Sequence, residues 1–148
     1  MSGGPGPRAR RAARWAWVGV RAWRNLPATA AAVTWARVNG ATVTVGADLL
    51  VECAGMRPGS YARGGTTVGN AWLHGGLGGE QRRRHEARHA DQYALLGTTA
   101  FVTLYALNAL VTRNEPHRNV FERWAGLADG GYPTGRTRTA SRATSSSV

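Results

Sequence analysis

Basic and apolar positions recur at helical spacing near the start of the chain. Arginines separated by four, seven and three residues fall on one face of a helix predicted over residues 8–24. These arginines are Arg10, Arg14, Arg21 and Arg24. Trp15 and Trp23 lie off that face, and Pro27 is expected to end the helix because proline lacks a backbone N–H. Two interpretations stay open: a basic helix that rests on an anionic membrane surface, and a solvated arm whose tryptophans pack on the domain.

The next segment alternates between apolar and polar residues with the period of a β-strand. Residues 41–45 alternate without a break, and a turn signal separates them from the apolar residues 49–51, which predicts a hairpin. A second strand is predicted over Thr66–Leu73, between two glycine pairs. A glycine-rich stretch then leads to a helix that begins near Glu80. We therefore expect a small antiparallel strand layer over residues 41–73, followed by helices.

A long uncharged run follows the start of this helix. Tyr93–Thr112 contains no charged residue over twenty positions, which is long enough to cross a bilayer. Threonine, asparagine and glycine within the run dilute its apolar character. The prediction is a buried core helix, and a helix embedded in a membrane surface is the competing interpretation.

Composition and charge narrow the class of protein. The chain has 148 residues, 43% of them hydrophobic, which fits one compact domain with short tails. The formal net charge of +11 is concentrated at the ends, because residues 1–37 contain seven Arg and residues 130–148 three, with no acidic residue in either segment. Residues 38–129 carry nine Arg against eight acids and are nearly neutral. We therefore expect no specific nucleic-acid partner.

The motif that indicates chemistry lies at residues 85–89, which read His-Glu-Ala-Arg-His, or H-E-x-x-H. On a helix, His85 and His89 lie on one face one turn apart, so both imidazoles reach a single cation. Zinc suits two neutral imidazoles with a third ligand, and it lowers the pKa of a bound water to about 7. Glu86 would lie beside the metal and take a proton from that water. The alternative is a solvent-facing histidine patch next to the arginines at 82–84.

A third ligand is needed, and the sequence offers several. The candidates are His74 upstream and Asp91, Glu115, His117, Glu122 and Asp129 downstream. Glu122 is favoured because it lies in a short predicted helix capped by Asn119, and because the small Ala125 lets that helix approach the first one closely. His117 is the reserve ligand. The competing interpretation of Glu122 is a surface carboxylate paired with a neighbouring arginine.

This arrangement resembles the gluzincin type of zinc metallopeptidase, in which H-E-x-x-H lies on one helix and a glutamate, followed by alanine three residues later, lies on another. More narrowly, residues 41–132 resemble small bacterial HExxH proteins of poorly characterised function. The residues that match are Thr67, Val68, Gly69, His85, Glu86, His89, Gln92, Tyr93, Asn119, Phe121, Glu122 and Ala125. The resemblance implies His85, His89 and Glu122 as zinc ligands and Glu86 as general base. It also implies that Gln92 orients an imidazole or the bound carboxylate.

A peptidase also needs a place for its substrate and a donor for the oxyanion. Peptides commonly lie along a strand edge, for which Thr66–Leu73 is the candidate. The oxyanion donor stays open among four residues. These are Tyr93, Tyr132, His74 and His117.

These observations predict an α+β fold in which the strand layer precedes an HExxH helix, an apolar helix and a short helix bearing Glu122. We expect three parts: a basic N-terminal arm (1–37), a zincin-like metal-binding domain (38–132) and a disordered basic Ser/Thr tail (133–148). The predicted function is a minimal zinc-dependent metallohydrolase acting on peptide or protein substrates. The alternative is a noncatalytic metal-binding or membrane-associated protein with a degenerate site.

The cellular location is predicted from two features of the sequence. The single cysteine, Cys53, can form neither an internal disulfide nor a cage of several thiolates, so a reducing compartment is the simpler interpretation. We expect a cytoplasmic protein, with peripheral contact to an anionic membrane through the Arg-rich N-terminus as a further expectation.

Overall fold

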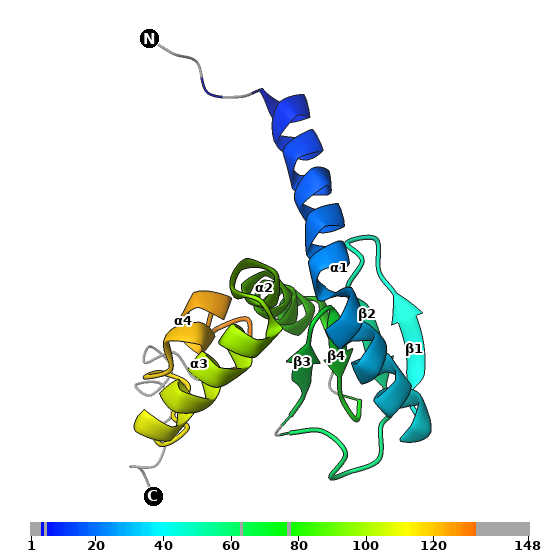
Figure 1. The fold of residues 1–148 in the computed structure, drawn as a ribbon, viewed down its shortest axis with the longest axis vertical. Coiled ribbons are helices and arrows are strands. Elements are labelled where there is room, and N and C mark those ends of the chain that lie inside the picture. Colours follow the sequence, from blue (N-terminus) through cyan, green and yellow to red (C-terminus); the bar gives the residue numbers. More distant parts are fainter. Residues whose placement is uncertain (1–3, 5, 63, 77, 133–148) are drawn as a thin grey trace, which may run out of the picture.

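The computed structural model describes residues 4, 6–62, 64–76 and 78–132 and has the predicted α+β fold (Figure 1). Its elements are α1 (Pro7–Val38), β1 (Thr42–Val45), β2 (Val51–Ala54), β3 (Thr66–Val68), β4 (Ala71–Leu73), α2 (Glu80–Leu96), α3 (Thr98–Val111) and α4 (Val120–Ala125). The predicted tail over residues 133–148 lies outside the described residues.

The four strands form one mixed sheet in the order β1-β2-β4-β3. β1 and β2 are the predicted antiparallel hairpin, with Val43 opposite Cys53. β2 and β4 are parallel, so the prediction of an antiparallel layer is wrong. The reason is the connection after β2, which crosses over to the far edge before the chain returns, as parallel pairing requires. The single strand predicted over Thr66–Leu73 is likewise two strands, β3 and β4, which pair antiparallel.

The turn between β3 and β4 packs against α1. Gly69 has a φ of +61°, and a Cβ there would lie 2.9 Å from the backbone nitrogen of Thr29 and 3.0 Å from the carbonyl oxygen of Asn25. Glycine therefore allows both the turn and the close approach of the helix. The backbone N–H of Asn70 donates to Thr29 Oγ1 at 2.8 Å, which ties the turn to α1.

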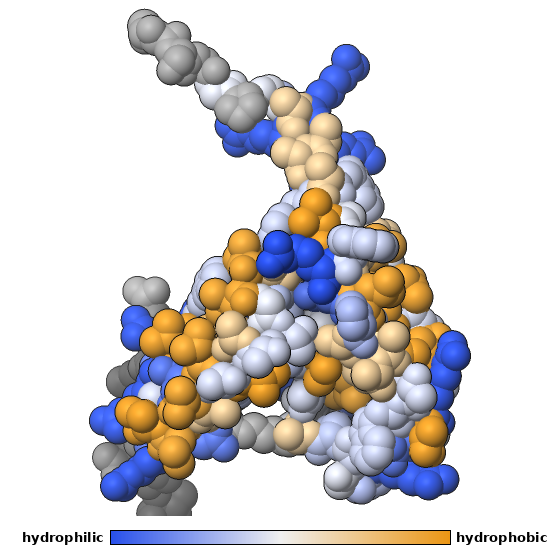
Figure 2. Space-filling view, in the orientation of Figure 1, coloured by the Kyte–Doolittle hydropathy of each residue, from blue (hydrophilic) through white to orange (hydrophobic). Residues whose placement is uncertain are grey.

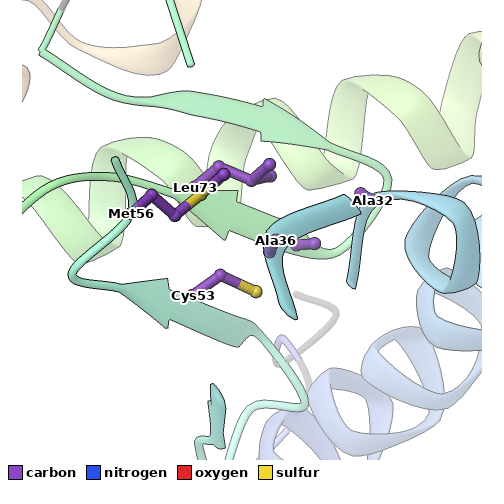
Figure 3. Packing of buried hydrophobic residues seen from close by; sticks show 6 residues of the cluster. Ala32, Ala36, Cys53, Met56 and Leu73 are labelled. Carbon is purple, nitrogen blue, oxygen red and sulfur yellow. The ribbon is translucent and has the colours of Figure 1, made fainter. Parts of the chain in front are cut away.

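The second half of α1 belongs to the hydrophobic core. Ala32 and Ala36 are buried against Cys53, Met56 and Leu73 of the sheet region (Figure 3). Alanine suits this position because its small side chain lets the helix lie close to the strands. Part of the segment assigned to the N-terminal arm is thus core of the domain.

Pro27 does not end this helix, so that prediction is wrong: α1 is continuous from Pro7 to Val38. Pro27 lies on the exposed side of α1, and Trp23, whose carbonyl loses its usual partner at a proline, has a side chain 76% exposed. The proline therefore lies on the solvent side, and the opposite side of α1 stays packed on the sheet. The N-terminal part of the helix projects beyond the rest of the molecule (Figure 1).

Polar contacts fasten α1 to α2. Arg21 is buried, although the helical spacing placed it on one basic face with Arg10, Arg14 and Arg24. Its guanidinium donates to Asp91 Oδ1 at 3.2 Å and to the carbonyl oxygen of Asp48 at 2.5 Å. The indole N–H of Trp17 donates to the same Asp91 oxygen at 2.9 Å. These contacts set the position of the HExxH helix relative to the sheet.

The uncharged run does not form one buried helix, so that prediction is also wrong. Gly97, with a φ of +83°, divides it into the end of α2 and the separate helix α3, and the two helices are bent by 118°. Phe101 is the only buried residue of α3. Within the described residues, no single helix is long and apolar enough to span a membrane, although α2 and α3 pass such a test when taken together as a bent pair.

Candidate metal centre

The two histidines of the HExxH motif lie on the inner face of α2. His85 and His89 are both buried, and their Nε2 atoms are 3.1 Å apart. The helix places them one turn apart on the same side, as the sequence predicted. The solvent-facing histidine patch is therefore not what the structure has.

The third side chain comes from α4. Asn119 caps this helix as predicted, since its Oδ1 accepts from the backbone N–H groups of Phe121 and Glu122. Ala125 is fully buried and lets α4 approach α2. Glu122 Oε2 consequently lies 3.3 Å from His85 Nε2 and 3.6 Å from His89 Nε2. Three buried donor atoms, all within 4.8 Å of one another, form a group that could hold a metal ion.

The outer ring nitrogens determine which tautomer each histidine adopts. His85 Nδ1 lies 3.0 Å from the carbonyl oxygen of Gly126, and His89 Nδ1 lies 2.8 Å from Gln92 Oε1. Gln92 in turn donates from Nε2 to the carbonyl oxygen of Phe121 at 3.0 Å, which fixes the orientation of its amide. Both Nδ1 atoms therefore face acceptors and carry the proton, so both Nε2 lone pairs point to the centre. The predicted role of Gln92 in orienting an imidazole agrees with this geometry.

A carboxylate oxygen without a donor completes the centre. Glu122 Oε2 is buried and has no hydrogen-bond partner among the described residues. Burial by itself raises the pKa of Glu122, but the adjacent rings of His85 and His89 and the hydroxyl of Tyr105 outweigh it and hold the pKa of that carboxyl well below its usual range. Burial lowers the pKa of His85, yet the nearby carboxylates of Glu122 and Glu86 raise it overall. The centre thus attracts positive charge, which a proton or a metal cation supplies.

Tyr105 of α3 was not predicted as a site residue. Its hydroxyl donates to Glu122 Oε1 at 2.5 Å, which leaves Oε2 as the oxygen turned to the histidines. The signal in the sequence was weak: Phe101 and Tyr105 stand one helical turn apart in the uncharged run, a spacing that equally fits ordinary core packing.

Glu86 lies next to the centre without joining it. The carboxylate is buried and accepts a hydrogen bond of 2.6 Å at Oε2 from the hydroxyl of Thr67, a residue of β3. Thr67 is one of the residues on which the predicted resemblance rests, but its contact with Glu86 could not be predicted from the sequence. The strand and the helix are thus joined at the residue predicted to act as base.

A cavity of about 380 Å³ opens beside these side chains. It is bordered by the edge strand β3, by α3 and by the chain after α4. Residues that line it include His85, Glu86, Thr67, Phe101, Tyr105 and Tyr132. A small organic group or a peptide side chain therefore has direct access to the candidate metal centre.

Arg88, inside the HExxH motif, hydrogen-bonds the chain between Ala125 and Asp129, next to His85. Arg88 donates to the carbonyl oxygen of Ala125 at 2.6 Å and to Asp129 Oδ2 at 2.8 Å. The hydrogen bond from Arg88 is the main cause that lowers the pKa of the Asp129 carboxyl. These contacts fix the chain around Gly126, whose carbonyl accepts from His85.

The other proposed ligands lie elsewhere. His74 contacts Glu52, Asp91 contacts Arg21, Glu115 contacts Arg118, and Asp129 contacts Arg84 and Arg88. His117 is exposed and does not belong to the buried metal-ligand group. Of the four candidate oxyanion donors, Tyr93 and Tyr132 line the cavity.

No protein-family model matches this chain, and no curated protein sequence or solved structure shows significant similarity to it. The resemblance to gluzincins stays a prediction. The function is therefore argued from the geometry of the site alone.

Proposed function

We propose that this protein is a zinc-dependent metallohydrolase that cleaves peptide bonds. His85, His89 and Glu122 would hold the zinc ion, and Glu86 would act as general base. The catalytic zinc sites of hydrolases commonly have three protein ligands from this donor set and leave a fourth position open.

The observation that carries the proposal is the buried Glu122 Oε2, which has no hydrogen-bond donor in the part of the chain that the structure describes and faces two ring nitrogens. Leaving such an oxygen unpaired costs free energy unless a cation fills the space between the three atoms. Imidazole nitrogens favour zinc over the hard cations magnesium and calcium, which prefer oxygen ligands. Zinc, when bound, acidifies a water molecule and polarises a carbonyl group.

Glu86 is suited to proton transfer because it lines the cavity and because a hydrogen bond from Thr67 orients its carboxylate. It lies in the cavity wall, directly after His85 in the helix, and Thr67 fixes its Oε2. Its other oxygen, Oε1, is the atom that would accept a proton from the attacking water. The same carboxyl group would then pass that proton to the leaving amine.

Two further features support a peptide substrate. The cavity borders β3, an edge strand whose outer side pairs with no other described strand and can hydrogen-bond an extended peptide. Tyr132 lines the same cavity, with its ring centroid 6.1 Å from that of His85. We propose Tyr132 as the donor to the developing oxyanion, because it lines the cavity beside His85.

Metal content and turnover of a mixed peptide library, measured on the same samples, test this proposal. Purified protein should hold about one zinc per chain. Glu86→Gln should keep that zinc, while turnover falls by about two to four orders of magnitude because the amide cannot accept the proton. The matched control is Glu80→Gln, the same change on an exposed side chain of α2. This control should change neither the zinc content nor the turnover of the peptide library. Equal turnover by wild type and Glu86→Gln, with zinc intact, would exclude the general-base role.

A further inference from the structure

Helix α3 is apolar and yet exposed. It contains no charged residue, and Phe101 is its only buried side chain. Its exposed large hydrophobic residues are Val102, Leu104, Leu107, Leu110 and Val111. Figure 2 shows hydrophobic side chains gathered over this part of the molecule, at the lower left. A helix of this composition is normally covered by protein or by lipid.

The exposed surface continues from α3 onto α4. The backbone N–H of Val120 donates to Asn108 Oδ1 at 3.1 Å, so the start of α4 lies beside α3. Val120 and Trp124, one turn apart on α4, are both exposed. We call the exposed hydrophobic side chains of α3, together with Val120 and Trp124, the apolar face. Exposed hydrophobic side chains gathered on neighbouring helices are typical of an interaction surface.

We propose that the apolar face docks into the surface of an anionic lipid bilayer. The partner is indicated by local charge: the segment that follows α3 brings three arginines, Arg113, Arg118 and Arg123, to exposed positions, against one exposed acid, Glu115, which pairs with Arg118. Hydrophobic side chains next to arginines bind anionic lipid through both apolar burial and electrostatic attraction. Trp124 adds a residue type that is enriched at membrane interfaces.

Two other occupants fit the apolar face less well. A second copy of the chain would bring a second set of the exposed arginines at 113, 118 and 123 to this face, and like charges repel each other. The C-terminal segment 133–148 contains no Leu, Ile, Met, Phe, Trp or Tyr, so it has few side chains with which to cover a hydrophobic face.

The dimensions indicate a helix lying in the membrane surface. Thr98–Val111 is 14 residues long, which corresponds to about 21 Å and is shorter than the roughly 30 Å hydrocarbon core of a bilayer. The bend of 118° directs α2, with its charged residues, away from the axis of α3. Phe101, Val102, Tyr105 and Ala106 of α3 also line the cavity, so the candidate site would open next to the lipid. This inference does not rest on the proposed function.

Cosedimentation of the full chain with lipid vesicles tests the proposal. The probes are vesicles of mixed phosphatidylcholine and phosphatidylglycerol, and vesicles of phosphatidylcholine alone. The test variant is Leu110→Glu/Val111→Glu, because these side chains are 76% and 82% exposed. The matched control is Val38→Glu/Val45→Glu, at side chains 69% and 64% exposed and outside the apolar face. Both double variants change the net charge equally, and circular dichroism verifies the fold of each.

Wild type should cosediment with the mixed vesicles and stay partly bound after a high-salt wash, because salt screens the charges and not the apolar contact. The test variant should lose about ten-fold or more in partitioning, and the control about two-fold at most. If the two variants lose vesicle partitioning equally, electrostatic attraction alone accounts for the binding, and the proposal is overturned. Wild type that stays in solution with mixed vesicles would also overturn it. A wild-type dimer, seen by light scattering and dissociated by the test variant, would assign the face to a second copy instead.

Discussion

Tyr105 of α3 donates a 2.5 Å hydrogen bond to Oε1 of Glu122 in α4, and this contact links the exposed apolar helix to the candidate metal centre. It also assigns a different role to each oxygen of the carboxylate, since Oε2 faces His85 and His89. The orientation of Glu122, the proposed third ligand, therefore depends on a helix that contributes no proposed ligand itself.

Removing this hydroxyl should weaken metal binding. Tyr105→Phe keeps the ring packed on Phe101 but leaves Glu122 Oε1 without its donor, so the carboxylate is less well oriented. We expect the zinc dissociation constant to rise about 10- to 100-fold, the usual effect of losing a residue that orients a ligand. Competition with a chromophoric chelator measures it. Tyr93→Phe is the matched control, because Tyr93 also packs on Phe101 and lines the cavity. An unchanged constant in Tyr105→Phe, or equal effects in both variants, would contradict this role.

Thr67 is expected to act as a positioning residue for Glu86. Thr67→Val has nearly the same shape but cannot donate to Glu86 Oε2, a contact of 2.6 Å in the native protein. We expect turnover of the peptide library to fall by about 10- to 100-fold while zinc content stays at the wild-type level. Thr67→Ser, which retains the hydroxyl, should recover most of the activity. If serine fails to restore activity, the effect of valine belongs to packing in β3.

The contact between Arg21 and Asp91 should stabilise the fold. Arg21 is buried and Asp91 is partly exposed, so Arg21→Met leaves a carboxylate without its cation at the α1–α2 interface. We expect the free energy of unfolding to fall by about 2 to 4 kcal/mol. Adding Asp91→Asn should restore part of this loss, and the double-mutant cycle gives the coupling energy. Arg24→Met, at an exposed position of the same helix, should change the free energy by less than about 0.5 kcal/mol. Additive effects at positions 21 and 91 would show that the pair is not coupled.

Cys53 should be unreactive in the folded protein. Burial is the main cause that raises the pKa of its thiol to about 11, and the side chain is fully buried. A thiol-specific maleimide at pH 8 should therefore leave native protein unlabelled and label the chain in guanidinium. Rapid labelling of the native protein would show that Cys53 is accessible.

The same shift predicts how stability depends on alkaline pH. The folded protein binds the thiol proton more tightly than the unfolded chain, so this contribution is present below about pH 9 and is lost as the pH rises towards 11. Between pH 8 and 10.5 the free energy of unfolding should fall by about 2 kcal/mol more in wild type than in Cys53→Ala. Equal slopes for the two proteins would contradict the assignment.

Local patterns in the sequence were sufficient to predict much of the candidate site. The four-residue spacing of His85 and His89 determines that they share a helix face, and Asn119 caps the helix that carries Glu122 in a way that depends only on adjacent backbone. Gln92 is one turn from His89, so the contact with that imidazole, which the resemblance implied, is also local. These predictions held because each depends on residues a few positions apart.

Only the tertiary structure decided the contacts that act across long stretches of chain. Thr67 reaches Glu86 and Tyr105 reaches Glu122 through packing between different elements, which no periodicity encodes. Pro27 stands inside a continuous helix on the exposed side of α1, while the core side of the helix stays packed. Gly97 turns an uncharged run into two helices because glycine tolerates a φ of +83° at the bend. The sequence by itself determines which reactive side chains the protein has and which of them share a helix turn. The tertiary structure determines which side chains from different elements come into contact.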